Sequence, residues 1–226
     1  MRNEVPPEAL PLTGAIFDCD GTLLDSIGAW FSLQDDLAAK AGSVLSAEEV
    51  SHLNALTLPQ TAQFFHERFG LGASPQEVLD IIDETMYGHY ENSVSARPGA
   101  LGFVRGLHEC GKKCRVASST SPVLLRRALE VAGFTPYLDA IVSVDDVGAS
   151  KRYPDVYDRA RELMGTPQES TWVFEDSLYA VETLKKAGYR TVGVYDRDES
   201  GTLEELALAD LVVEDFQSPA LALFLR

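Results

Sequence analysis

The feature that most constrains the fold of this chain is a regular alternation of short apolar runs and amphipathic segments from Pro98 to the C-terminus. The apolar runs predict buried strands, and the segments between them have helical periodicity. The expected strands are 114–117, 140–144, 171–174, 191–195 and 211–213, and the expected helices are 100–110, 123–131, 155–164 and 178–187. Strands and helices that alternate through short loops form a parallel sheet with helices on both faces. We therefore predict an α/β, Rossmann-like fold.

One further strand is expected near the N-terminus, separated from the others by helices alone. Residues 13–17 form an apolar run that ends in the polar turn Asp-Cys-Asp-Gly-Thr. The segment after this turn has helical patterning, with capping-box sequences at 46–49 and 74–77. We predict an α-helical domain inserted after the first strand. The expected boundaries are 1–25 and 97–226 for the α/β domain and 26–96 for the helical insertion.

The charge of the chain limits its partners. The 226 residues include 35 acidic and 19 basic ones, for a formal net charge of −16. This excess opposes binding to phosphate backbones and to anionic lipid, so we expect no nucleic-acid and no membrane partner. A small phosphorylated ligand is compatible with this negative charge, because a metal ion and a lysine can make the local charge of a pocket positive. We expect a monomer or a weak dimer.

The cysteines and the N-terminal segment indicate the compartment. Cys19, Cys110 and Cys114 are odd in number and form no Cys-x-x-Cys pair, so we expect reduced thiols. Residues 1–14 contain no apolar run of signal-peptide length, and no stretch approaches ~20 apolar residues. We expect a cytoplasmic protein.

The turn after the first strand holds two carboxylates that suit phosphoryl transfer. Such a reaction requires a nucleophile, a proton donor for the leaving oxygen, and positive charge. Asp18 and Asp20, two residues apart on an extended segment, place their side chains on one face of the chain. The alternative is a simple acidic turn, since Asp and Gly are common turn residues. The apolar strand before the pair, and Gly21 and Thr22 after it, favour the functional interpretation.

Four segments, in chain order, resemble the motifs of the haloacid dehalogenase superfamily. The string from Ile16 to Ser26 resembles the first motif, and 116–119, which ends in Ser118 and Ser119, resembles the second. Lys151, three residues before a Pro-Asp pair, resembles the third, and 174–177 with Glu175 and Asp176 resembles the acidic fourth. The helical insertion lies where the family has its cap of the first type. The chain is similar in this to phosphoglycolate phosphatases and β-phosphoglucomutase-like proteins.

The resemblance implies a role for each acidic residue. Asp18 becomes the nucleophile and Asp20 the general acid and base, whose backbone carbonyl also faces the metal. Glu175 and Asp176 join Asp18 and Asp20 as ligands of Mg²⁺, which prefers oxygen ligands. A cation is needed because a phosphate dianion ~4 Å from a carboxylate is strongly repelled. Glu175 and Asp176 have a second interpretation as the N-terminal cap of the next helix, and the two roles are compatible.

The remaining roles also come from the resemblance. The Ser118 hydroxyl and the backbone N–H of Ser119 bind the phosphoryl group, although a serine after a strand is more often a turn former. Lys151 is a catalytic lysine, although a single lysine is usually solvated. The family pattern Gly-Lys-Pro-x-Pro-Asp is incomplete at Lys151, which leaves the geometry of its loop open. For Arg152 the alternatives are a phosphate contact and a solvent-facing side chain, and we expect the solvent-facing one.

The predicted function is Mg²⁺-dependent hydrolysis of a small phosphorylated metabolite, such as a sugar phosphate, through an aspartyl-phosphate. One alternative is a β-phosphoglucomutase-like phosphoryl transferase, which shares the four motifs but has a histidine early in the first cap helix. Trp30 occupies that position here, either as a cap core residue or as a substrate contact. The other alternative is a non-catalytic relative that binds a phosphorylated ligand.

Overall fold

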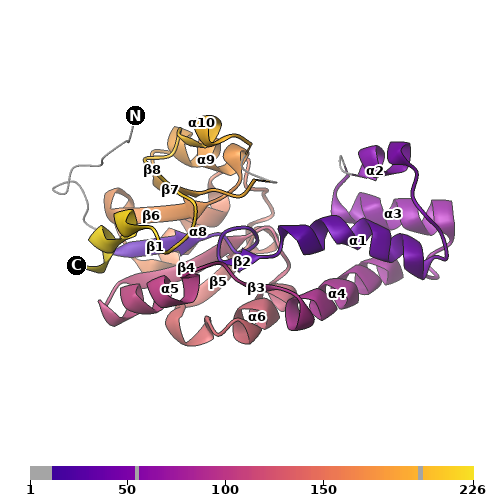
Figure 1. Cartoon of the computed structure of the whole chain (residues 1–226), viewed down its shortest axis with the longest axis horizontal. Coiled ribbons are helices and arrows are strands. Elements are labelled where there is room, and N and C mark those ends of the chain that lie inside the picture. The colour runs from indigo at the N-terminus through magenta and orange to yellow at the C-terminus, as the bar shows by residue number, and fades with distance from the viewer. Residues whose placement is uncertain (1–11, 54–55, 198–200) are drawn as a thin grey trace. The chain divides into compact units, whose positions relative to one another are not determined.

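The structure is a computed structural model that describes residues 12–53, 56–197 and 201–226. The N-terminal segment in which we expect no signal peptide lies, up to residue 11, outside the described residues. The chain divides into two compact units: one comprises Met1–Asp25 and Ser95–Arg226, and the other comprises Ser26–Val94. Figure 1 labels the elements of both units. Within the described ranges, no helix is long and apolar enough to cross a membrane.

The first unit is built on a parallel sheet. In the described part of the chain, six strands form it in the order β5-β4-β1-β6-β7-β8. Their bounds are β1 Gly14–Phe17, β4 Lys113–Ser118, β5 Ala140–Ser143, β6 Thr171–Glu175, β7 Arg190–Val194 and β8 Leu211–Val213. The predicted parallel α/β sheet is confirmed. Its first strand lies in the interior of the sheet, between β4 and β6, where all four residues are buried.

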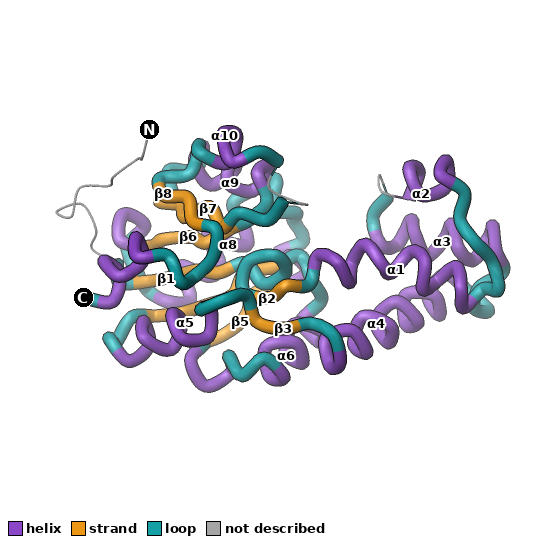
Figure 2. The backbone as a smooth tube through the Cα atoms, viewed as in Figure 1, coloured by secondary structure: helices purple, strands orange, loops and turns teal. Residues whose placement is uncertain are grey.

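Helices cover both faces of this sheet, as Figure 2 shows. The helices of the first unit are α5 Ala100–Glu109, α6 Pro122–Val131, α7 Val144–Val147, α8 Asp155–Met164, α9 Leu178–Lys186 and α10 Leu203–Leu206. The short 3₁₀ segments are η2 Thr135–Tyr137, η3 Gln168–Ser170 and η4 Pro219–Leu225. The four helices expected between the strands correspond to α5, α6, α8 and α9.

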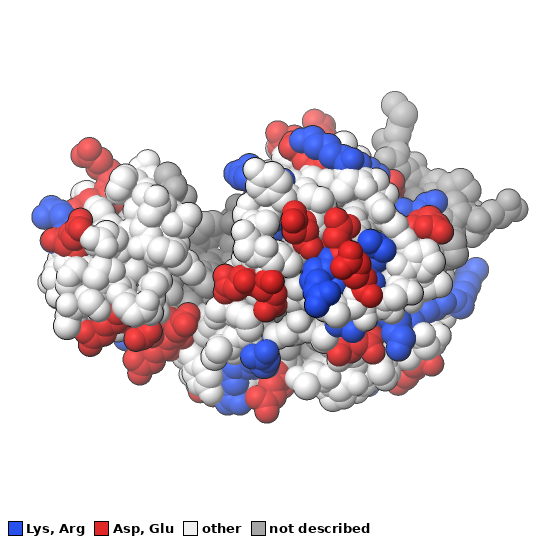
Figure 3. Space-filling model, turned by 180° about the vertical axis from the view of Figure 1, so that it is seen from behind, with Lys and Arg blue, Asp and Glu red and all other residues white. Residues whose placement is uncertain are grey.

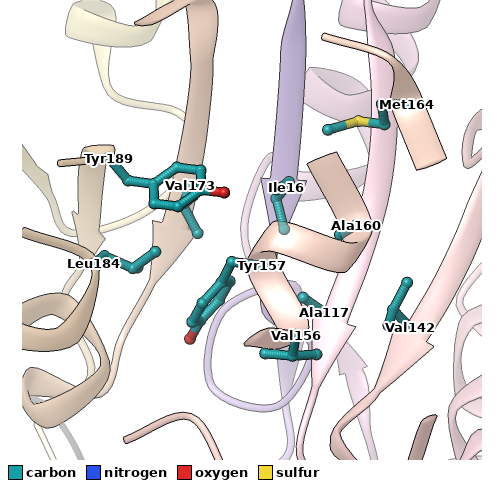
Figure 4. Packing of buried hydrophobic residues seen from close by; sticks show 10 residues of the cluster. All are labelled: Ile16, Ala117, Val142, Val156, Tyr157, Ala160, Met164, Val173, Leu184 and Tyr189. Atoms are coloured by element: carbon teal, nitrogen blue, oxygen red, sulfur yellow. The ribbon is translucent and has the colours of Figure 1, made fainter. Parts of the chain in front are cut away.

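Alternate residues of β1 pack into two different hydrophobic cores. Ile16 faces α8 and α9, where it belongs to a buried cluster with Tyr157 and Leu184 (Figure 4). Phe17 points to the opposite face, where its ring stacks on Phe174 and meets Phe103 of α5 edge to face. Because side chains alternate along a strand, an interior strand needs apolar residues at every position. This explains the continuous apolar run before the acidic turn.

The second unit is helical. Its elements are α1 Ile27–Lys40, α2 Ala47–Leu53, α3 Leu58–Phe69 and α4 Pro75–Asn92. Of the two expected capping boxes, the one at Ser46 is complete, since Ser46 and Glu49 each accept a hydrogen bond from the other's backbone N–H. At the other, Ser74 accepts from Glu77 N–H, while the Glu77 carboxylate accepts from Ala73 N–H.

The second unit is strongly acidic. Residues 26–94 contain ten Asp and Glu residues against Lys40 and Arg68. Acidic groups also dominate on the part of this unit seen in Figure 3. In the first unit, by contrast, the same view shows acidic and basic side chains side by side. The charge balance of the chain therefore differs between its two units.

A two-stranded antiparallel ribbon departs from the expectation of helices alone up to residue 96. It pairs β2 Leu24–Asp25 with β3 Ser95–Ala96. Two residues per strand are too few for a periodic signal, so the sequence pattern does not reveal them. The ribbon joins the segment that leaves the sheet to the segment that returns to it.

Candidate active site

The site lies at the carboxyl ends of three adjacent strands. Phe17 pairs with Val116 of β4 on one side and with Phe174 of β6 on the other. The next residue, Asp18, donates its backbone N–H to the Phe174 carbonyl at 2.9 Å. Parallel strands end at one edge of a sheet, so the residues that follow β1, β4 and β6 come together there.

Asp18 is held by a buried lysine. Lys151 lies in the loop between α7 and α8, and its Nζ donates to Asp18 Oδ1 and to Glu175 Oε1. The exposed fractions of Asp18, Lys151 and Glu175 are 5%, 4% and 0%. The structure thus brings these three predicted residues into contact, although the loop of Lys151 lacks part of the family pattern.

Burial and neighbouring charges change the acidity of this cluster. Burial raises the pKa of Asp18 to about 7, with Glu175 adding to the rise and Lys151 opposing it. Burial also raises the pKa of Asp176, and the charges of Asp18 and Glu175 add to that rise. For Lys151, burial acts to lower the pKa, but the two carboxylates outweigh it and raise the pKa above its ordinary value. One ammonium group therefore does not compensate three buried carboxylates.

Glu175 has two further donors that fix its position. The Tyr157 hydroxyl of α8 donates to Glu175 Oε1 at 2.7 Å, and the Ser177 backbone N–H donates to Oε2 at 3.2 Å. Tyr157 is fully buried in the core cluster. The sequence pattern gave no sign of this role, because a tyrosine in an amphipathic helix looks like an ordinary core residue. The one available signal is that a buried tyrosine hydroxyl needs a hydrogen-bond partner.

Three carboxylates of this cluster offer a possible metal site. One oxygen each of Asp18, Glu175 and Asp176 lies within 4.8 Å of the others. Thr22, which belongs to the first motif but had no expected role, donates its hydroxyl to Asp176 Oδ1 at 2.8 Å. A buried set of oxygen donors with excess negative charge fits Mg²⁺, a small cation that is usually held by one or two carboxylates and waters. The residues present therefore fit the predicted ion.

Asp20 lies at the rim of the cluster and is half-buried. Its Oδ2 accepts a hydrogen bond of 2.7 Å from the hydroxyl of Thr120, a buried residue that the sequence analysis also missed. Gly21, the next residue, has a φ of 83°, a conformation that favours glycine and turns the chain away from the strand.

The two serines of the second motif have different environments. Ser118 is the last residue of β4 and is buried, and its Oγ accepts from the Thr120 backbone N–H at 3.1 Å. Ser119 is exposed. The structure therefore places Ser118 at the same sheet edge as Asp18, while the Ser119 side chain faces solvent.

Two residues left open by the sequence occupy separate places. Arg152 is exposed and its guanidinium lies 5.0 Å from the ring centre of Tyr179. The expectation of a solvent-facing side chain thus holds, with an added cation–π contact. Trp30 is half-buried in α1.

Comparison with known proteins points to one family. The sequence profile described as haloacid dehalogenase-like hydrolase matches residues 15–194. Hexitol phosphatase B of Escherichia coli (strain K12) is 26% identical over 202 residues, which cover 88% of this chain and 90% of that protein. Phosphoglycolate phosphatase of Agrobacterium fabrum is 27% identical over 224 residues, which cover 93% of this chain and 91% of that protein.

A solved structure supports the same fold. CbbY from Rhodobacter sphaeroides, crystallised in complex with phosphate, matches with a TM-score of 0.75 and 22% sequence identity. The match covers 91% of this chain and 95% of that one. At this identity the likeness concerns the fold, and the chemistry rests on the side chains described above.

Proposed function

Because this chain belongs to the haloacid dehalogenase-like hydrolase family, we propose that it is a Mg²⁺-dependent phosphatase that hydrolyses a small phosphorylated metabolite through an aspartyl-phosphate on Asp18. The observation that carries this proposal is the position of Asp18. It directly follows the interior strand β1, its carboxylate accepts a hydrogen bond from Lys151, and it lies two residues before a second carboxylate, Asp20. A nucleophile, a cation and a proton donor are the groups that this reaction needs.

In the first step, an oxygen of the Asp18 carboxylate attacks phosphorus, and the bond between phosphorus and the ester oxygen breaks. Asp20 donates a proton to that leaving oxygen, so the product departs as an alcohol. In the second step, Asp20, now a carboxylate, accepts a proton from water while the water oxygen attacks the phosphorus of the acyl phosphate. The bond between phosphorus and the Asp18 oxygen breaks, inorganic phosphate leaves, Asp18 is again a carboxylate, and Asp20 is again protonated.

The other residues of the site serve charge and position. Lys151 holds Asp18 in place and offsets part of its charge, and Ser118 provides a hydroxyl for the transferring group. Asp18, Glu175 and Asp176, with the backbone carbonyl of Asp20, would hold Mg²⁺. When bound, that ion supplies the positive charge that lets an anionic phosphate approach a carboxylate. The buried excess of negative charge in the cluster supports this assignment.

The names of the relatives suggest the class of substrate. Hexitol phosphatase B and phosphoglycolate phosphatase are named for small phosphate monoesters whose leaving groups are aliphatic alcohols. We expect a substrate of this kind for the present chain.

The direct test is the release of inorganic phosphate from hexitol phosphates, hexose phosphates and phosphoglycolate, with Mg²⁺ and with excess chelator. We expect turnover of at least one of these compounds with Mg²⁺ and none with chelator. Binding of phosphorylated compounds without turnover would instead favour a non-catalytic relative.

A further inference from the structure

Thr120 makes three hydrogen bonds that join separate parts of the site. Its hydroxyl donates to Asp20 Oδ2 at 2.7 Å, and its backbone N–H donates to Ser118 Oγ at 3.1 Å. Its carbonyl accepts from Ser143 Oγ at 2.9 Å, at the end of β5. Thr120, Ser118 and Ser143 are all buried. We propose that Thr120 is the positioning residue for Asp20, which aims the carboxyl group that protonates the leaving oxygen.

This inference rests on the proposed function, because it assigns a task to the proton donor of that reaction. Asp20 follows the last residue of β1 by three positions and lies outside the ladders of the six-stranded sheet, where its backbone forms an isolated bridge with Leu24. That bridge fixes the backbone, whereas the side-chain carboxyl group has several rotamers of its own. The hydrogen bond from the Thr120 hydroxyl favours one of these orientations.

The hydrogen bond fixes the direction in which the Asp20 carboxyl group points. The Thr120 hydroxyl donates to Asp20 Oδ2 at 2.7 Å, which ties one oxygen of the carboxyl group to the edge of the sheet. Proton transfer requires the donor within hydrogen-bond reach of the leaving oxygen, so a carboxyl group that turns out of this orientation protonates the leaving oxygen less often.

Thr120 is itself rigid. Two backbone hydrogen bonds hold it, one to the end of β4 and one to the end of β5, and its β-branched side chain has few rotamers. The Thr120 hydroxyl is therefore held in one position at the edge of the sheet. Thr120 also touches Ser118, so the residue that orients the proton donor is tied to the residue proposed to contact the phosphoryl group.

A positioned proton donor matters most for poor leaving groups. Nitrophenolate departs as a stable anion without protonation, whereas phenolate and alkoxides depart more slowly unless an acid protonates them. Loss of the Thr120 hydroxyl should therefore slow phenyl phosphate more than p-nitrophenyl phosphate. The two substrates have nearly the same shape, so a general distortion of the site would affect both alike.

The experiment compares kcat and KM for these two compounds in the Mg²⁺-loaded full chain and in three variants. Thr120→Val removes the hydroxyl and keeps the shape, Thr120→Ser keeps the hydroxyl, and Thr166→Val removes another buried hydroxyl. Thr166 is a matched control because it lies near Gly14, at the opposite end of β1, with its hydroxyl 2.8 Å from Thr171 Oγ1.

We expect Thr120→Val to lower kcat for phenyl phosphate by about 10²-fold and for p-nitrophenyl phosphate by less than about tenfold, with KM little changed. Thr120→Ser should stay within a few-fold of the parent, and Thr166→Val should show no difference between the substrates. If Thr120→Val loses its circular dichroism signal, Thr120→Ala removes the same hydroxyl with less crowding.

Equal losses with both substrates, or a Thr120→Ser variant as impaired as Thr120→Val, would overturn the positioning role. The same assay on Asp18→Asn distinguishes a failure of the role of Thr120 from a failure of the proposed function. Turnover of either compound by Asp18→Asn would contradict the covalent mechanism, whereas its absence together with equal losses in Thr120→Val would contradict the role of Thr120 alone.

Discussion

The hydroxyl of Tyr157 donates to the same oxygen of Glu175 that accepts from Lys151, and the bond from Tyr157 is 2.7 Å long. This contact joins helix α8 to the end of strand β6 at a place where a carboxylate is fully buried. Donors of this kind orient a metal ligand and limit which oxygen it presents. Loss of the Tyr157 hydroxyl should therefore weaken the metal site that we propose includes Glu175.

Tyr157→Phe should raise the Mg²⁺ concentration needed for half-maximal activity by about tenfold, because outer donors to metal ligands typically contribute that much to affinity. Tyr189→Phe is the matched control: Tyr189 is also buried, and its hydroxyl donates to Asp158 at 2.6 Å, outside the carboxylate cluster. A magnesium titration of phosphatase activity measures both. Equal shifts in the two variants would contradict a specific role for Tyr157.

Asp18→Asn should lower kcat by at least about 10³-fold without unfolding the protein, because an amide is nearly isosteric but does not form the phosphoryl ester. Phosphate release and circular dichroism are the measurements. Activity close to that of the parent, with an unchanged dichroism spectrum, is incompatible with Asp18 as the nucleophile.

Chelation should abolish activity, since the charge of Asp18, Glu175, Asp176 and a phosphate needs a divalent cation to offset it. Mg²⁺ should restore turnover and Ca²⁺ should not, because the larger ion takes more ligands at longer distances. Phosphate release is measured after dialysis against chelator and readdition of each metal. Full turnover in excess chelator would contradict the assigned metal site.

The metal-free protein should lose stability as the pH rises from about 4 to about 7. Asp18 has a pKa of about 7 in the folded chain against 3.8 as the ordinary value, mainly because of burial. Between these values the folded state keeps a proton that the unfolded state has released. Stability therefore falls with rising pH, and Asp176, whose pKa is also raised, contributes in the same direction.

Thermal melting in chelator at about pH 5 and about pH 8 measures this effect. Asp18→Asn removes one of the titrating groups. The melting temperature of the parent minus that of the variant should therefore be smaller at the higher pH. Mg²⁺ should remove part of that decrease, because a bound cation favours the carboxylate form. A constant difference between parent and variant would contradict the raised pKa of Asp18.

Water should capture the phosphoenzyme more often than a sugar does. A mutase must hold a bisphosphate in two orientations and needs cations for the phosphate that is not transferred. The segment expected as a cap offers Lys40 and Arg68, and Trp30 stands where β-phosphoglucomutase-like proteins have a histidine.

The assay supplies β-glucose 1-phosphate with a bisphosphate activator and follows both glucose 6-phosphate and inorganic phosphate. We expect phosphate release without interconversion. Isomerisation faster than phosphate release would show a mutase.

The sequence by itself determined the parallel α/β core and the residues that begin the site. A buried strand must be apolar on both faces, so the apolar run before Asp18 can be recognised from the sequence alone. The alternation of strands and helices after Pro98 can be recognised in the same way. Asp18, Asp20, Glu175 and Asp176 stand directly at or after strand ends, where the topology alone predicts that they meet.

Only the tertiary structure decided which other side chains complete the cluster. No role for Tyr157, Thr22 or Thr120 is evident from the sequence. In the folded chain the hydroxyl of each one donates to a carboxylate on a different segment. Lys151 is expected from its place before the Pro-Asp pair, but its two buried partners, 133 and 24 residues distant, are seen only in the tertiary structure. Local pattern records which face of an element is apolar, whereas a hydrogen bond between distant residues depends on strand order and register, and these exist only once the sheet has formed.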